Sequence, residues 1–314
     1  MKLVFFGTPE FAVPSLRALL ESGHAVVRVI TQPDEPKGRG RRLAPPPVKV
    51  AAQEAGVPVL QPAGLDESLL PGQVDAAVVV AYGKIIPESL LKIPRRGFVN
   101  VHASLLPKYR GAAPVSWAIR NGESVTGVTT MRMAKSLDTG DILLQKECEI
   151  SPRETAGELH DRLAETGAGL LVETLRQWEA GALAPKPQDD SQATYAPKLT
   201  KRDGLVPWDR SARAVDCHVR AMTPWPGAFG YLEGRIVKIL RGLPAERAIE
   251  EASGPSAAGE ILALEADDLL VRCGEGAYRV EQIQPEGRRA MSGREFLAGR
   301  PKVIGQRFEG KAPS

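Results

Sequence analysis

The chain has 314 residues, of which 43% are hydrophobic and 25% charged, and these globular proportions exclude general disorder. At roughly 100–200 residues per domain, this length favours two domains. The formal net charge of +3 is mildly basic, so it permits nucleic acid as a partner without requiring one.

Strand-like and helix-like segments alternate over the first two hundred residues. Short β-branched or apolar runs separated by amphipathic segments predict β-α-β units, and hence a doubly wound, Rossmann-like α/β domain. The predicted strands are Lys2–Gly7, Ala25–Ile30, Asp75–Tyr82, Gly97–His102, Val125–Met133 and Ile142–Ile150. The predicted helices are Pro9–Ser22, Ala112–Asn121 and Thr155–Glu179.

The alternation lapses between Pro185 and Pro207, a stretch with the composition of a connection between domains. We therefore expect a first domain over residues 1–189, a linker over 190–207 and a second domain over 208–314. In the second domain, a helix over Ser211–Met222 precedes short strands separated by Gly-rich turns, which predicts a small, OB-like β-barrel. Its predicted strands are Ala228–Leu232, Arg235–Leu240, Gly259–Glu265, Asp268–Cys273 and Ala277–Ile283.

Several kinds of partner and site are not expected. No run approaches the ~20 apolar residues of a membrane span, and the apolar N-terminal run is too short for a signal peptide, so we expect a cytoplasmic location and no membrane partner. The three cysteines are widely spaced and odd in number, and the four histidines show no metal-binding spacing. Neither a disulfide framework nor a metal site is expected.

Two loops of the first domain are candidates for binding phosphate groups. The turn Gly7–Glu10 has one glycine and lacks the dinucleotide fingerprint, which argues against a nicotinamide oxidoreductase. The second loop carries five Lys or Arg residues in the thirteen positions from Lys37 to Lys49, interleaved with glycine. Such a loop is either solvated surface or a contact for a phosphate backbone.

Asn100 and His102 are two residues apart on a predicted strand, so their side chains project from the same face at its C-terminal end. Ligands of open α/β sheets bind at that end, although a histidine there can also be a satisfied core residue. Asp138 lies in a turn between two later strands and becomes relevant if it meets His102. Without a nucleophile motif or a metal, Asn, His and Asp suit oxyanion stabilisation and proton transfer between two bound substrates.

Motifs along nearly the whole chain resemble one known family. The Asn100-Val-His102 motif, the stretch Ser104–Pro114 and the position of Asp138, thirty-six residues after His102, are similar to the folate-dependent formyltransferases. Within that family, three further stretches resemble the branch that acts on a charged initiator tRNA, and the resemblance weakens after Leu240. These stretches are Gln32–Gly40, Thr194–Thr200 and Pro224–Phe229.

The resemblance implies a reaction in which the formyl group of 10-formyltetrahydrofolate passes to the α-amino group of methionyl initiator tRNA. It implies that Asn100 donates a hydrogen bond to the oxyanion, that protonated His102 adds positive charge, and that Asp138 orients His102 and assists proton transfer. The folate pocket implied by the resemblance comprises Ser104, Leu105, Leu106 and Pro107 with the turn Ala81, Tyr82 and Gly83. The implied tRNA contacts are Lys37, Arg39, Arg41 and Arg42, with the second domain on the tRNA backbone. We further expect a monomer.

Two alternatives remain open at this stage. One is a formyltransferase that acts on a small amine, such as a nucleotide sugar or glycinamide ribonucleotide, although a small acceptor needs neither the basic loop nor the second domain. The other is a non-catalytic RNA-binding protein that keeps only the α/β scaffold.

Overall fold

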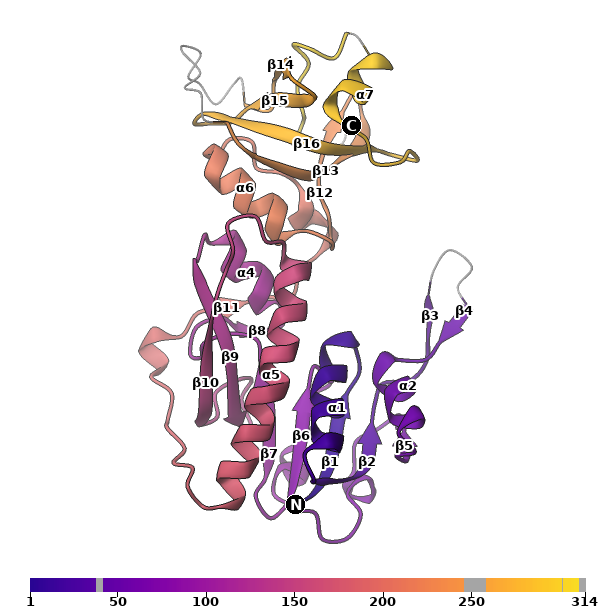
Figure 1. The fold of residues 1–314 in the computed structure, drawn as a ribbon, viewed down its shortest axis with the longest axis vertical. Helices are drawn as coiled ribbons and strands as arrows, with labels where there is room; N and C mark the ends of the chain where they lie inside the picture. Colours follow the sequence, from indigo (N-terminus) through magenta and orange to yellow (C-terminus); the bar gives the residue numbers. More distant parts are fainter. Residues whose placement is uncertain (38–41, 246–257, 301, 311–314) are drawn as a thin grey trace. The chain divides into compact units, whose positions relative to one another are not determined.

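Figure 1 shows the computed structural model, which describes residues 1–37, 42–245, 258–300 and 302–310. The chain packs as two compact units that do not follow its order. The first unit comprises Met1–Pro114, Val125–Glu149 and His160–Ala196, and the second comprises Val115–Ser124, Ile150–Leu159 and Pro197–Ser314. The division between Ala196 and Pro197 falls inside the predicted linker 190–207.

The first unit is built on a seven-stranded sheet in the order β10-β9-β7-β6-β1-β2-β5. The five strands from β5 to β7 run parallel, whereas β9 is antiparallel to both β7 and β10. This arrangement confirms the predicted α/β fold. The strands are β1 (Lys2–Gly7), β2 (Ala25–Ile30), β5 (Val59–Leu60), β6 (Ala76–Val80), β7 (Phe98–His102), β9 (Val125–Arg132) and β10 (Ile142–Glu149).

The predicted helices are present, with shifts of a few residues at their ends. The segment 9–22 divides into a 3-10 turn and an α-helix, and the long helix extends from Ala156 to Glu179. The shorter elements escaped prediction because runs of two to eight residues carry too little periodicity. The helical elements are η1 (Glu10–Ala12), α1 (Val13–Glu21), α2 (Pro47–Glu54), η2 (Glu67–Leu69), α3 (Glu88–Leu91), α4 (Pro114–Arg120) and α5 (Ala156–Glu179).

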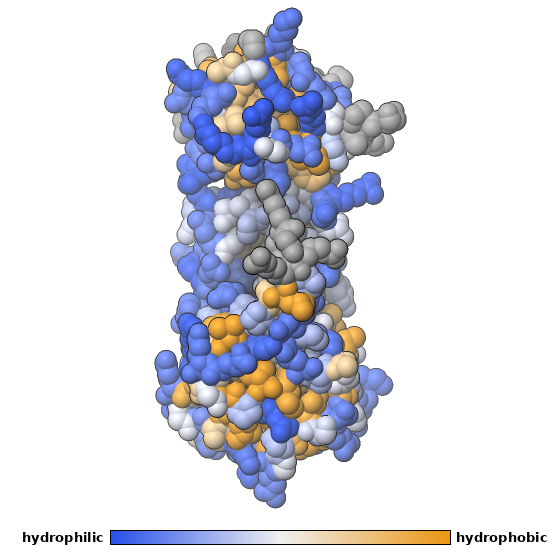
Figure 2. Space-filling view, turned by 90° about the vertical axis from the view of Figure 1, so that its right-hand side faces the viewer, coloured by the Kyte–Doolittle hydropathy of each residue, from blue (hydrophilic) through white to orange (hydrophobic). Residues whose placement is uncertain are grey.

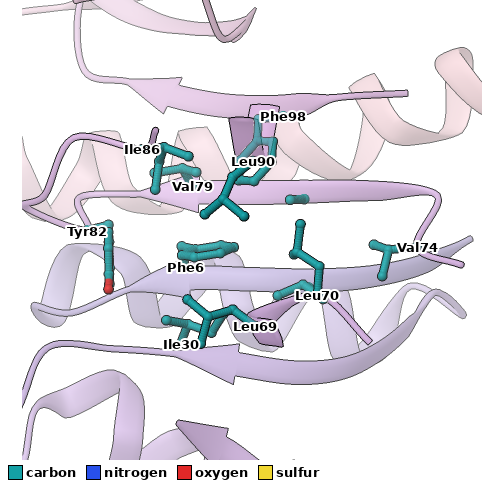
Figure 3. Close-up of a cluster of buried hydrophobic side chains, with 12 residues drawn as sticks. Phe6, Ile30, Leu69, Leu70, Val74, Val79, Tyr82, Ile86, Leu90 and Phe98 are labelled. Atoms are coloured by element: carbon teal, nitrogen blue, oxygen red, sulfur yellow. The ribbon is translucent and has the colours of Figure 1, made fainter. Parts of the chain in front are cut away.

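A cluster of buried side chains packs on one face of the parallel strands (Figure 3). The Phe6 ring meets the Tyr82 ring edge-on at 5.4 Å between centroids and the tilted Phe98 ring at 5.6 Å. Every residue of β6 is buried, because the strand is covered on both faces. The continuous apolar runs that predicted these strands are the consequence of that double cover.

The predicted linker 190–207 contains short elements of its own. Residues Asp190–Gln192 form the turn η3, Tyr195–Ala196 form the strand β11, and Lys201–Gly204 form the turn η4. Strand β11 pairs in parallel with β8 (Arg110–Gly111), within the first unit. The stretch from Asp190 to Ala196 is therefore part of the first unit.

The second unit carries a five-stranded antiparallel sheet in the order β12-β13-β16-β15-β14. The segment 305–309 exchanges backbone hydrogen bonds with Tyr231 of β12 at one edge and Ile261 of β14 at the other. Closure of both edges by one segment confirms the predicted small barrel. The elements are α6 (Ala212–Ala221), β12 (Ala228–Leu232), β13 (Arg235–Pro244), β14 (Ile261–Glu265), β15 (Asp268–Arg272), β16 (Ala277–Pro285) and α7 (Gly293–Ala298).

Figure 2 views the molecule from the side on which Figure 1 places the short strands β3 (Glu35–Lys37) and β4 (Arg42–Ala44). Hydrophobic residues gather on the lower part of this face, and hydrophilic residues cover much of the remainder. Within the described part of the chain, no helix combines the length and the apolar character needed to cross a membrane.

Candidate active site

Asn100 and His102 lie on β7, of which His102 is the last residue. In the sheet register Asn100 stands between Val79 and Met131, and His102 is opposite Thr129. Residues two apart on a strand share a face, so the two polar side chains project together from the C-terminal end of β7. Asn100 is half-buried while His102 is 6% exposed.

The His102 ring lies between two hydrogen-bond acceptors. Its Nε2 atom is 2.9 Å from the Tyr109 carbonyl oxygen, which can only accept, so Nε2 carries a hydrogen. Its Nδ1 atom is 3.8 Å from Oδ2 of Asp138. This separation is within the range of an ion pair but too long for a direct hydrogen bond. The structure thus brings together the His102 and Asp138 side chains that the sequence analysis considered as a pair.

Asp138 lies in a tight turn between β9 and β10. Its backbone has φ 54°, in the left-handed region that the short polar side chain of aspartate tolerates better than most. Its Oδ2 atom accepts a 2.9 Å hydrogen bond from the backbone N–H of Gly111. Two residues later, a Cβ atom on Gly140 would lie 1.6 Å from the Arg132 carbonyl oxygen, so only glycine fits there. The turn chemistry seen in the sequence therefore determines where the carboxylate lies.

The Ser104–Pro107 loop begins one residue after β7 and is held by hydrogen bonds to Lys108 and to Thr129 of β9. The Ser104 hydroxyl is fully buried and donates to the Lys108 carbonyl at 2.6 Å. The Thr129 hydroxyl donates to the Ser104 carbonyl at 2.6 Å and accepts from the Leu106 N–H at 3.1 Å. The Leu106 side chain is buried, whereas Leu105 and Pro107 are half-buried. The side chains of Leu105 and Pro107 are therefore the ones this loop can offer to a ligand.

The second stretch with predicted folate contacts is the turn after β6. Ala81 and Gly83 are exposed and have positive φ angles of 46° and 86°. The Tyr82 side chain between them is 2% exposed and belongs to the core cluster, and its carbonyl accepts from Thr8 Oγ1 at 3.0 Å and Gln32 Nε2 at 3.2 Å. Only the backbone on either side of Tyr82 is open to a ligand here.

The basic loop has a stem formed by β3 and β4, in which Lys37 pairs with Arg42. Arg39 and Arg41 lie outside the described residues. Lys49, counted in the basic cluster, is instead part of a local ion pair, because its Nζ atom is 2.8 Å from Asp34 Oδ1. Hydrogen bonds from Lys49 and Gln61 lower the pKa of the Asp34 carboxyl. The basic charge of this loop is thus smaller than the sequence indicated.

The sequence analysis did not identify two residues near Asp138, namely Gln188, which contacts the Asp138 turn, and Arg110, which contacts Gln188. Gln188 donates to the carbonyl oxygens of Asp138 and Gly140, and its own Oε1 accepts from Arg110. Gln188 is fifty positions from Asp138 in the chain and lies in the stretch 185–207, which has the composition of a connection between domains. No local motif distinguishes it. Arg110 stood within the motif that carried the family resemblance, but its burial was not visible in the sequence.

Over residues 1–37, 42–245, 258–300 and 302–310, no three His, Cys, Asp or Glu side chains gather in a way that could hold a metal ion.

Comparisons with known proteins cover both parts of the chain. The family model "Formyl transferase" matches residues 1–175, and "Formyl transferase, C-terminal domain" matches residues 198–301. A protein of Citrifermentans bemidjiense named Methionyl-tRNA formyltransferase is 50% identical over 304 residues, covering 95% of this chain and 93% of its own length. A protein of the same name from Heliobacterium modesticaldum is 49% identical, covering 98% of this chain and all of its own length.

Solved structures share the fold at lower identity. An N-formyltransferase from Helicobacter canadensis, in complex with folinic acid and dTDP-3-aminofucose, matches 89% of this chain and 98% of its own with a TM-score of 0.68 and 17% identity. HypX from Aquifex aeolicus, in complex with tetrahydrofolic acid, matches 97% of this chain with a TM-score of 0.62 and 20% identity, although this chain spans only 48% of HypX. On the two family models and the full-length relatives, the chain belongs to the formyl transferase family.

Proposed function

We propose that the chain transfers the formyl group of 10-formyltetrahydrofolate to the α-amino group of methionyl initiator tRNA. Relatives named Methionyl-tRNA formyltransferase match 95–98% of this chain at 46–50% identity. The match at this identity extends through the second unit. We also propose that the chain acts as a monomer in the cytoplasm, where charged tRNA is used.

The observation that carries the proposal is the His102–Asp138 pair, 3.8 Å apart, beside an Asn100 amide on the same face of β7. When an amine attacks a formyl carbon, negative charge develops on the formyl oxygen. An amide donor and a cationic ring stabilise such charge, and the pair needs no nucleophilic side chain. The arrangement suits direct transfer between two bound substrates.

We assign the steps to side chains as follows. Asn100 donates a hydrogen bond to the developing oxyanion, and the His102 imidazolium supplies positive charge next to it. Asp138 orients His102 and, through a water molecule, helps to move the proton that the attacking amine loses. The bond between the formyl carbon and the folate nitrogen then breaks, and that nitrogen takes up a proton as tetrahydrofolate leaves. Because His102 and Asp138 are both almost fully buried, water screens these charges less than it would at the surface.

The proposed folate contacts fit the exposed backbone found near the site. 10-Formyltetrahydrofolate supplies the formyl group when it is bound. The turn from Ala81 to Gly83 presents backbone without bulky side chains, and a Cβ built on Gly83 meets only Gln32 Nε2, at 3.8 Å. A flat ring can approach such a surface closely. Ser104, Leu105, Leu106 and Pro107 are proposed to form the opposite side of the pocket, with Leu105 and Pro107 in direct contact.

The proposed tRNA contacts are Lys37, Arg39, Arg41 and Arg42. Replacing Arg39 and Arg41 together by alanine should raise the KM for charged tRNA and make it less dependent on salt. With fewer phosphate contacts, binding of the tRNA releases fewer counterions. Slow hydrolysis of formyl-folate should continue at its normal rate. Arg176→Ala is the matched control, since this arginine is exposed on α5 and pairs with Glu173. An unchanged KM in the double variant would remove the loop from the tRNA site.

The choice of substrate is tested by offering three amines with the same formyl donor. Methionyl initiator tRNA, methionyl elongator tRNA and a nucleotide amino sugar are incubated separately, and each product is identified by mass spectrometry. We expect N-formylmethionine on the initiator tRNA at a rate far above the other two. Formylated sugar with unmodified tRNA would establish the small-amine alternative instead.

A further inference from the structure

Arg110 and Gln188 form a polar link between the loop after β7 and the turn that carries Asp138. Nε and Nη2 of Arg110 both donate to Oε1 of Gln188, at 3.1 Å and 2.8 Å. Nε2 of Gln188 donates to the carbonyl oxygens of Asp138 at 2.8 Å and Gly140 at 2.7 Å. One side-chain amide therefore makes four hydrogen bonds, two to the arginine and two to the turn.

The chemistry of the partners fixes which way the Gln188 amide points. A guanidinium group can only donate hydrogen bonds, and a backbone carbonyl can only accept them. Oxygen must therefore face Arg110, and nitrogen must face Asp138 and Gly140. Reversing the amide would break all four contacts at once, so the orientation of Gln188 is determined.

Arg110 is itself held firmly enough to act as an anchor. The residue is 3% exposed, and its Nη2 atom pairs with Asp190 Oδ1 at 2.6 Å. Its backbone N–H donates to the Thr194 carbonyl at 2.8 Å, where β8 pairs with β11. Both the side chain and the backbone of Arg110 thus connect to the segment from Gln188 to Ala196.

The turn that Gln188 contacts needs such support. Asp138 has the left-handed φ of 54°, which is unfavourable for a residue with a side chain, and the turn must also keep Oδ2 within reach of Gly111 and His102. Holding the carbonyls on both sides of Thr139 restrains the backbone from which the carboxylate projects. The contact with the turn is to its backbone, so Gln188 acts on Asp138 through the backbone.

We propose that Gln188 is a positioning residue, oriented by Arg110, that holds the Asp138 turn so that the carboxylate stays against His102. The expected effect of Gln188 on the rate of formyl transfer rests on the proposed function. The link would make the segment 188–196 a requirement for fast formyl transfer.

Gln188→Glu separates the contacts of Gln188 with the Asp138 turn from its contacts with Arg110. The new side chain has the same shape and still accepts from Arg110, but it loses both donors and turns carboxylate oxygen toward two carbonyl oxygens. We expect kcat for formyl transfer to fall about 10- to 100-fold, the range for a misplacement of about 1 Å, with little change in the KM for formyl-folate. We expect Gln188→Ala to lower kcat by a similar factor. Gln192→Ala is the matched control, because Gln192 lies in the same segment and donates only to the exposed Asp189.

A double variant tests whether the effect passes through Asp138. In an Asp138→Asn background, adding Gln188→Glu should lower kcat by less than twofold, since the charge that Gln188 positions is already gone. A full additional loss of 10-fold or more would show that Gln188 acts independently and would overturn the proposal. Wild-type kcat in Gln188→Glu would overturn it as well, because the residue would then serve only as the partner of Arg110.

A spectroscopic readout keeps this test separate from the proposed function. The ring ¹⁵N chemical shifts of His102, measured at fixed pH without substrates, report whether the carboxylate still faces Nδ1. We expect them to change in Gln188→Glu and to stay unchanged in Gln192→Ala. If the wild-type chain formylates no amine but the shifts change, the proposed function fails while the positioning role stands. Unchanged shifts in Gln188→Glu would refute the positioning role whatever the substrate.

Discussion

Asp138→Asn removes one charge from the site and leaves its shape almost intact. The amide oxygen of the new side chain can still accept from the Gly111 N–H, which the carboxylate meets at 2.9 Å. What is lost is the negative charge 3.8 Å from His102 Nδ1. The variant therefore loses the attraction between this carboxylate and the positive charge that we propose His102 supplies in the transition state.

The structure sets the size of the expected effect. Two unit charges about 4 Å apart attract by about 4 kcal/mol at an effective dielectric constant of about 20. Since about 1.4 kcal/mol corresponds to a tenfold change in rate, the whole attraction amounts to about 10³-fold. Part of it is already present before the reaction begins, so we expect kcat to fall by about 10²- to 10³-fold.

A second His–Asp pair in the same unit provides the control. His160 Nδ1 is 3.6 Å from Asp161 Oδ1, but the two side chains are 43% and 83% exposed. Water screens this surface pair, so Asp161→Asn should leave kcat within about twofold of wild type. Rapid-quench measurement of formyl transfer under single-turnover conditions compares the two variants without interference from product release. Retention of more than a third of the wild-type rate by Asp138→Asn would refute the electrostatic reasoning.

Three further predictions concern Asn100, His218 and Gly140. Asn100→Ala should lower kcat by about 10²- to 10³-fold while the Kd for a folate analogue, measured by calorimetry, changes little, because an oxyanion donor acts in the transition state. Burial lowers the pKa of His218 to about 4, below its unfolded value of 6.5, so the stability that the neutral ring contributes is lost as pH falls from 6.5 toward 4. Urea unfolding should show a loss of about 2–3 kcal/mol between pH 7 and pH 4.5 that His218→Gln removes; equal pH dependence in both proteins would contradict this. Gly140→Ala should lower the free energy of unfolding by about 1–3 kcal/mol, because its Cβ would overlap the Arg132 carbonyl, whereas Gly169→Ala, in open space on α5, should raise it by about 0.5–1 kcal/mol.

The strands and one half of the site could be predicted because their signals are local. Parallel strands that are covered on both faces have continuous apolar sequences, so β1 and β6 could be predicted from their apolar runs alone. Asn100 and His102 share a strand, and the two-residue period of a strand places them on one face without any tertiary information. Asp138 was identifiable as a turn residue, but only the fold shows that its carboxylate faces His102.

The remaining features depend on contacts between distant segments. The pairing of Gln188 with the Asp138 turn spans fifty residues, and the same stretch has the Pro-rich, polar composition of a linker. Lys49 was counted as free basic charge because nothing in the sequence assigns it to Asp34, fifteen positions away. The segments 115–124 and 150–159 belong to the second unit although predicted elements of the first surround them. Local propensity and spacing carry no information about such packing.

The most direct test follows a labelled formyl group from 10-formyltetrahydrofolate to charged initiator tRNA in the presence of the purified chain. The account predicts label on the α-amino nitrogen of methionine, with a single-turnover rate that falls at least about 10²-fold in Asn100→Ala. A wild-type chain that leaves the methionyl amine unlabelled, or an Asn100→Ala variant that transfers the label at the wild-type rate, would contradict it.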